Sequence, residues 1–285
     1  MSILPKLKHQ KIKANFLIPI QQAMLCFSIA CFPNHHDAAK ELAMLYLLLV
    51  LIAVSAGLIS GVVGTGSSII LLPILAIIFG AKLAVPIMAI ASVLGNSSRI
   101  LLWYQALNWR ALSLFLLTAI PTTILGAQQL WRLDAAWVNV WMGIFFLSML
   151  PIRRFMQRYP LHLNRLYFLL AGSMFGFLTG LVFSTGPLLL PLFNGFGLSR
   201  GTLLATEAAA SFALYLTKGL IFGYLGAIDK QIIWAGLLVG FALMIGNYFG
   251  KRIVMKLSQQ TFELLMDLML IVAGSSMLIH AVYLF

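Results

Sequence analysis

The sequence is poor in charged residues. Only 9% of its 285 residues are charged and 61% are hydrophobic, whereas about a quarter of the residues in an ordinary soluble domain are charged. This composition excludes a soluble globular protein. Several apolar stretches are long enough to span a bilayer and are separated by short polar turns, which indicates a polytopic helical membrane protein without an aqueous domain.

Acidic residues and cysteines are especially scarce. The sequence has seven acidic and nineteen basic residues, which give a formal net charge of +12. The basic residues gather at the ends of apolar segments, as they do on the cytoplasmic side of membrane proteins, and no basic helix is interleaved with aromatic residues that could stack bases. We therefore expect the protein to be embedded in a lipid bilayer and to have no nucleic-acid partner. The two cysteines, Cys26 and Cys31, are too few for a disulfide framework.

Motifs for nucleotide binding and hydrolysis are also missing. No G-x-x-x-x-G-K-[ST] loop is present, so energy for transport would come from ion gradients, the membrane potential or a partner. An intramembrane hydrolase would need Ser60, Ser67 or Ser68 to act with His280, but no G-x-S-x-G turn surrounds these serines. We therefore do not expect an enzyme.

Residues 1–41 form an N-terminal extension. Residues 1–13 are basic and 14–33 are moderately apolar, so the extension fits an extra spanning helix, an uncleaved signal anchor or a start codon placed too far upstream. We expect a solvated loop at 34–41, because no further ligand lies at a metal-site spacing from its two adjacent histidines and its aspartate. The sequence thus predicts neither a metal nor a cofactor.

Two of the later apolar segments are too short to cross a membrane. Residues 67–80 and 187–198 would each form a helix of about 20 Å, against a hydrocarbon core of about 30 Å. Each follows a glycine-rich break and contains or lies near a proline. The other expected helices are 42–64, 83–105, 110–131, 135–151, 165–183, 201–225, 231–250 and 262–285.

The two short segments belong to an internal repeat. GLISGVVGTGSSIILLP at 57–73 aligns with GFLTGLVFSTGPLLLP at 176–191. At nearly the same offset, Arg99 falls on Lys218. The chain therefore consists of two copies of one unit.

The number of elements in each copy predicts how the copies are oriented. The first repeat, 42–151, and the second, 165–285, hold about five helical elements each, an odd number that inverts one repeat relative to the other. The basic linker at 152–164 then lies in the cytoplasm, as the positive-inside rule requires. The alternative makes both short segments re-entrant and the repeats parallel. We favour an all-α polytopic membrane protein with two inverted repeats, each with a short broken helix.

The glycine-rich breaks predict an anion site. A helix that begins at a break presents unpaired N–H groups and the positive end of its dipole, and backbone at membrane depth is interrupted only where it faces protein or a watery cavity. The alternative is that the small residues serve close helix packing. The candidate residues are Gly64, Gly66, Ser67 and Ser68 in the first break and Ser184, Thr185 and Gly186 in the second.

The helix after each break adds polar side chains on one face. Asn96 and Arg99 share a face in the first repeat. Ser211, Tyr215 and Lys218 do so in the second. The two cationic residues either line the anion cavity or extend to the membrane interface by snorkelling.

Two carboxylates lie within apolar segments, Glu207 and Asp267. Either is a candidate for coupling transport to protons. The alternative for Glu207 is a structural ion pair with a nearby base such as Arg200. Together these features predict a secondary transporter of small anions, with an anion channel of the same fold as the alternative.

The repeated breaks and two further stretches resemble the TauE/SafE family of sulfite and organosulfonate exporters. The stretches are NSSRILLWYQALNWRAL at 96–112 and GFALMIGNYFGKRIVMKLSQQTFELLMDLMLIVAG at 240–274. The resemblance covers about residues 42–285. It implies a multi-pass inner-membrane protein that exports, and sometimes takes up, small sulfur-containing or carboxylate anions. The sequence leaves the anion, the coupling ion and a homo-oligomeric state open.

Overall fold

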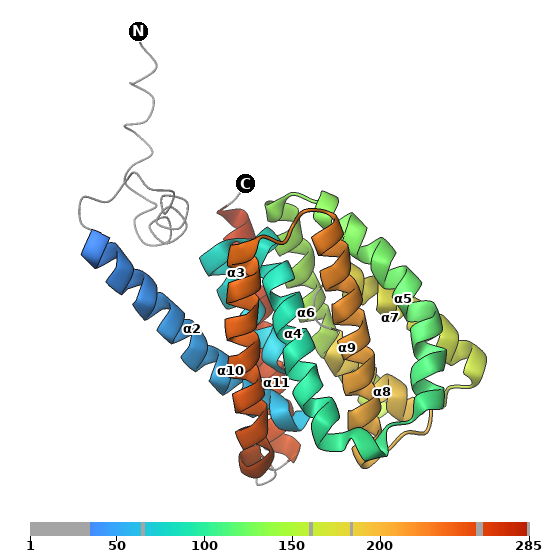
Figure 1. The fold of residues 1–285 in the computed structure, drawn as a ribbon. Coiled ribbons are helices and arrows are strands. Elements are labelled where there is room, and N and C mark those ends of the chain that lie inside the picture. The colour runs from blue at the N-terminus through green and yellow to red at the C-terminus, as the bar shows by residue number, and fades with distance from the viewer. Residues whose placement is uncertain (1–34, 64–65, 160–161, 183–184, 255–258, 284–285) are drawn as a thin grey trace.

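The computed structural model describes residues 35–63, 66–159, 162–182, 185–254 and 259–283, and this part of the chain is a bundle of helices (Figure 1). The helices are α2 (His35–Val63), α3 (Gly66–Phe79), α4 (Ala81–Trp103), η1 (Tyr104–Ala106), α5 (Trp109–Arg132), α6 (Ala135–Arg158), α7 (Arg165–Leu181), α8 (Gly186–Gly195), α9 (Arg200–Tyr224), α10 (Lys230–Val254) and α11 (Gln259–Val282). Five of them, α4, α5, α6, α10 and α11, are long and apolar enough to cross a membrane. The prediction of an all-α polytopic membrane protein is confirmed.

Two helices extend about two turns beyond the bounds that the sequence pattern predicts. The solvated loop expected at 34–41 is wrong, because α2 begins at His35; the alanines, lysine and glutamate there are good helix formers. The helix α6 continues to Arg158 instead of ending at 151, so most of the expected basic linker is helical. Arginine is also a good helix former, and a polar stretch ends the apolar segment without ending the helix. Residues 1–34 of the N-terminal extension lie outside the described residues.

Each half of the chain packs against helices of the other half. The helix α2 packs along α10, and α7 packs along α5; α3 contacts α11 as α8 contacts α6. The central helices α4 and α9 pack against each other. These contacts map onto one another when α2–α6 are exchanged with α7–α11, which is the correspondence that the repeat predicts. The inverted orientation of the two repeats in the membrane stays a prediction.

Glycines bring the two long helix pairs into close contact. A Cβ atom on Gly246 of α10 would lie 2.3 Å from the carbonyl oxygen of Val54 and 2.7 Å from the Cα of Gly57 in α2. A Cβ atom on Gly126 of α5 would lie 2.3 Å from the carbonyl oxygen of Phe177 in α7. Because no side chain fits at these distances, these glycines serve helix packing.

Aromatic contacts hold the short helix α8. Its first turn contains a proline, which loses no hydrogen bond at that position because the first helical N–H groups have no partner within the helix. Near its other end, the ring of Phe193 lies 5.1 Å from the ring of Phe115 in α5 and 5.4 Å from that of Phe168 in α7. These contacts fix that end of α8 against α5 and α7, and the helix also packs against the central helix α9.

Candidate functional site

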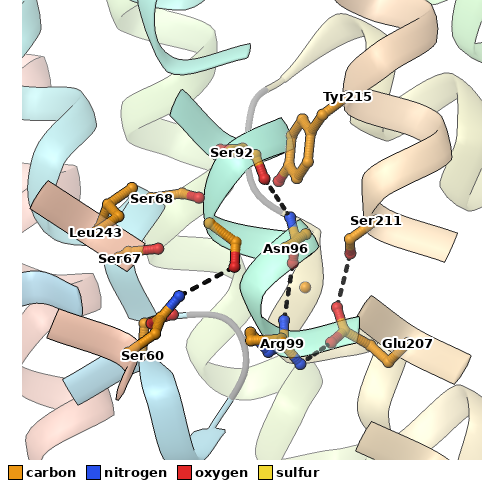
Figure 2. A pocket seen from close by; sticks show the side chains of 13 residues that line it. Ser60, Ser67, Ser68, Ser92, Asn96, Arg99, Glu207, Ser211, Tyr215 and Leu243 are labelled. Carbon is orange, nitrogen blue, oxygen red and sulfur yellow. Dashed lines mark hydrogen bonds and ion pairs between the residues drawn. The ribbon is translucent and has the colours of Figure 1, made fainter. Parts of the chain in front are cut away.

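A small polar cavity lies where the two short helices meet the central pair α4 and α9 (Figure 2). Its wall consists of Ser60 from α2, Ser67 and Ser68 from α3, Ser92, Gly95, Asn96 and Arg99 from α4, Gly186 from α8, Glu207, Ser211 and Tyr215 from α9, and Leu243 and Asn247 from α10. The first turns of α3 and α8 therefore face one space.

An ion pair between the two repeats lies in the cavity wall. Arg99 donates a hydrogen bond from Nη2 to Oε2 of Glu207 at 2.6 Å and one from Nη1 to Oδ1 of Asn96 at 2.9 Å. Ser211 donates from Oγ to Oε1 of Glu207 at 2.7 Å. Figure 2 shows this chain of contacts running from α4 to α9. Residues three or four apart share a helix face, so each helix presents its part of the network in one row.

This ion pair is almost completely shielded from solvent. The side chain of Arg99 is 4% exposed and that of Glu207 is 0% exposed. A buried pair offsets its desolvation only when further hydrogen bonds satisfy both ions, which Asn96 and Ser211 supply. Arg99 therefore does not snorkel. Glu207 pairs with Arg99, from the other repeat. The side chain of Arg200, the base suggested by the structural alternative, lies outside the described part of the structure.

Two buried polar atoms in the wall have no hydrogen-bond partner within the described part of the chain: Oγ of Ser92 and Oδ1 of Asn247. The two residues are 4% and 2% exposed. The amide nitrogen of Asn247 donates to the carbonyl oxygen of Gly95 and to Oγ of Ser98, at 3.0 Å each, which fixes the orientation of the amide. An unsatisfied buried polar group costs about 1–3 kcal/mol. Such atoms at a cavity indicate that a ligand or water occupies it.

Lys218 is not part of the cavity wall, which is one of the two positions expected for it. Its Nζ donates to the carbonyl oxygens of Thr179 and Val182, at 3.0 Å each. The residue is 0% exposed, so snorkelling is excluded as well. Although it lies only one turn beyond Tyr215, its ammonium group binds the end of α7.

Asp267 also lies away from the cavity wall. Its carboxylate pairs with Arg154 at 2.6 Å and with Arg153 at 3.5 Å, and these contacts join α11 to the last turns of α6. Its place in the structure is that of a structural ion pair. Of the two coupling candidates, Glu207 is the one in the cavity wall.

The remaining break residues have different positions. Thr185 precedes α8, and its hydroxyl group is hydrogen-bonded to that of Thr179; it does not belong to the wall. Gly66 is the first residue of α3. Gly64 and Ser184 lie outside the described residues.

Sequence reasoning did not assign Asn247 to the site. The residue follows the packing glycine Gly246 in an otherwise apolar helix, and an amide at such a position was the available signal, because polar groups in spanning helices usually face other protein or a cavity. Ser60, considered above only as a nucleophile, and Ser92 also belong to the wall.

Comparison with known proteins identifies the family. The family model described as Sulfite exporter TauE/SafE matches residues 49–277, a range that contains every residue of the cavity wall. No curated protein and no solved structure is significantly similar to the chain. The match covers most of the sequence and confirms the resemblance seen in its motifs. The chain therefore belongs to the TauE/SafE sulfite exporter family, whose members are membrane transporters and not enzymes.

Proposed function

We propose that the protein is a secondary transporter that exports sulfite, or a related small sulfur-containing or carboxylate anion, through the cavity between the two repeats. The observation that carries this proposal is the guanidinium group of Arg99 in a cavity bordered by the first turns of α3 and α8. A guanidinium group and helix N-terminal N–H groups are the donors that an oxyanion accepts from. The family match supports the class of substrate.

In this proposal, Glu207 is the counter-ion that holds Arg99 while the cavity is empty. An entering anion competes with the carboxylate for the guanidinium group, and Ser211 keeps its hydrogen bond to Glu207. The positive ends of two helix dipoles, about half a charge each, offset the extra negative charge. When the anion leaves, Glu207 binds Arg99 again, so neither ion stays unpaired.

The membrane potential supplies the driving force in this scheme. An anion that leaves with its charge gains about 2.3 kcal/mol per elementary charge for each 100 mV of inside-negative potential. A second scheme is favoured by the complete burial of Glu207: the carboxylate becomes protonated as the anion displaces it. Anion and proton would then move together, and a singly charged anion would show no response to the potential.

Transport by the purified protein in liposomes tests the proposal. We expect labelled sulfite to exchange across the membrane with saturation, and efflux to accelerate when an inside-negative potassium diffusion potential is imposed. Protein-free liposomes provide the baseline. Current that rises linearly with voltage and does not saturate would identify a channel. Saturable efflux whose rate is independent of the membrane potential but changes with a pH gradient would favour the proton-coupled scheme.

Removal of the Ser92 hydroxyl group gives a prediction that separates binding from folding. The variant Ser92→Ala should bind sulfite about fivefold less tightly, because one hydrogen bond of about 1 kcal/mol is lost. Its stability without ligand should be unchanged or slightly higher, because the hydroxyl oxygen has no partner within the described residues. Calorimetric titration and thermal unfolding measure the two effects.

Ser97→Ala is the matched control for this prediction. Ser97 lies on the same helix, outside the cavity wall, and donates to the carbonyl oxygen of Val93 at 2.7 Å. We expect it to leave sulfite affinity unchanged. A destabilised Ser92→Ala variant with wild-type affinity would show that the Ser92 hydroxyl group is structural.

A further inference from the structure

The end of α7 concentrates acceptor oxygens inside the protein. The helix ends at Leu181, and the last carbonyl groups of a helix have no donor within the helix and carry the negative end of its dipole. Thr179 and Val182, at this end, are 2% and 3% exposed. Water cannot solvate these oxygens freely, so a donor or a cation must do so.

Lys218, on α9, supplies a positive charge to these carbonyl oxygens. Its ammonium group contacts the carbonyl oxygens of Thr179 and Val182 at 3.0 Å each, and its Nζ lies 5.8 Å from the centre of the Phe222 ring. The hydroxyl groups of Thr179 and Thr185 are hydrogen-bonded to each other beside it, across the second break. Carbonyl oxygens at the end of a broken helix are the ligands that bind alkali cations in other membrane proteins.

We propose that the ammonium group of Lys218 is a tethered cation, which occupies a monovalent-cation site at the end of α7. It holds the second break in place without a free ion from solution. The residue that aligns with Lys218 in the first repeat, Arg99, binds a carboxylate instead. The two equivalent cationic residues therefore bind different kinds of acceptor. The inference holds whichever anion the cavity takes.

The position of the site explains what the tethered charge does. Lys218 links α9 to the end of α7, and Gly186, four residues after Val182, lines the anion cavity. The charge therefore positions the start of α8 relative to α9. If a free cation bound here instead, the geometry of the cavity would depend on its concentration.

The variant Lys218→Ala tests this inference, because it removes the ammonium group and leaves space for a small cation. Thermal unfolding of the purified protein is measured in sodium, ammonium and choline chloride at equal ionic strength. We expect the wild-type midpoint to be the same in all three salts. The variant should be less stable than wild type in choline chloride, and its midpoint should rise saturably, by roughly 5 °C, as sodium or ammonium replaces choline.

Leu214→Ala is the matched control. Leu214 is one turn away on α9 and fully buried, so its truncation creates a cavity without removing a charge, and its midpoint should not depend on the cation. If Lys218→Ala can be purified only in sodium or ammonium chloride, that result also supports the site. Aggregation of Lys218→Ala in every salt, or a midpoint that is the same in every salt, would overturn the inference. So would a cation dependence of equal size in the wild type.

Discussion

Replacement of Arg99 by glutamine is expected to weaken sulfite binding and to destabilise the empty protein at the same time. The lost hydrogen bond to a charged group costs about 1.5–3 kcal/mol, or roughly 10- to 150-fold in affinity. The variant also leaves the Glu207 carboxylate, which is 0% exposed, without its cation. Breaking a buried ion pair in this way costs about 3–5 kcal/mol of stability. Calorimetric titration with sulfite and thermal unfolding measure the two losses.

The double variant Arg99→Gln/Glu207→Gln separates the two effects. Two neutral amides at these positions can bond to each other, so we expect most of the lost stability to return while sulfite binding stays weak. The single variant Glu207→Gln should bind sulfite more tightly and release it more slowly, because the competing carboxylate is gone. Arg110→Gln, at an exposed position at the start of α5, is the control and should change neither property. Wild-type affinity in a stable double variant would exclude Arg99 from the site.

Replacement of Asp267 by asparagine should lower the stability of the protein strongly without changing sulfite transport. The change removes the negative charge that faces Arg153 and Arg154, and the Arg153 side chain is only 5% exposed. We expect a loss of stability on the order of 3 kcal/mol, measured by thermal unfolding. Sulfite transport by the protein that remains folded should be unchanged, because the residue does not line the cavity.

Asp134→Asn is the control for this prediction. Asp134 precedes α6 at an exposed position, and its side chain makes no capping hydrogen bond, so its replacement should change stability little. If Asp267→Asn is stable but loses its response to a pH gradient, Asp267 and not Glu207 would be the coupling carboxylate.

The sequence predicted most helices of the fold to within a few residues, because hydropathy and the glycine–proline breaks act locally. It also predicted that Asn96 and Arg99 share a face, because that spacing depends on one helix only. The partnership of Arg99 with Glu207 could not be predicted, because it joins residues 108 positions apart and depends on how α4 crosses α9. The same limit applies to Lys218, whose partners lie on α7.

The interlocked packing of the two halves constrains how the protein assembles as it is made. The glycine-lined contact of α2 is with α10, so this helix meets its main partner only after nearly the whole chain has been inserted. Contacts between segments so distant in sequence form slowly, because the entropy of closing the intervening loop must be overcome first. During synthesis, an amino-terminal half alone would therefore leave the Gly57 face of α2 without its partner α10.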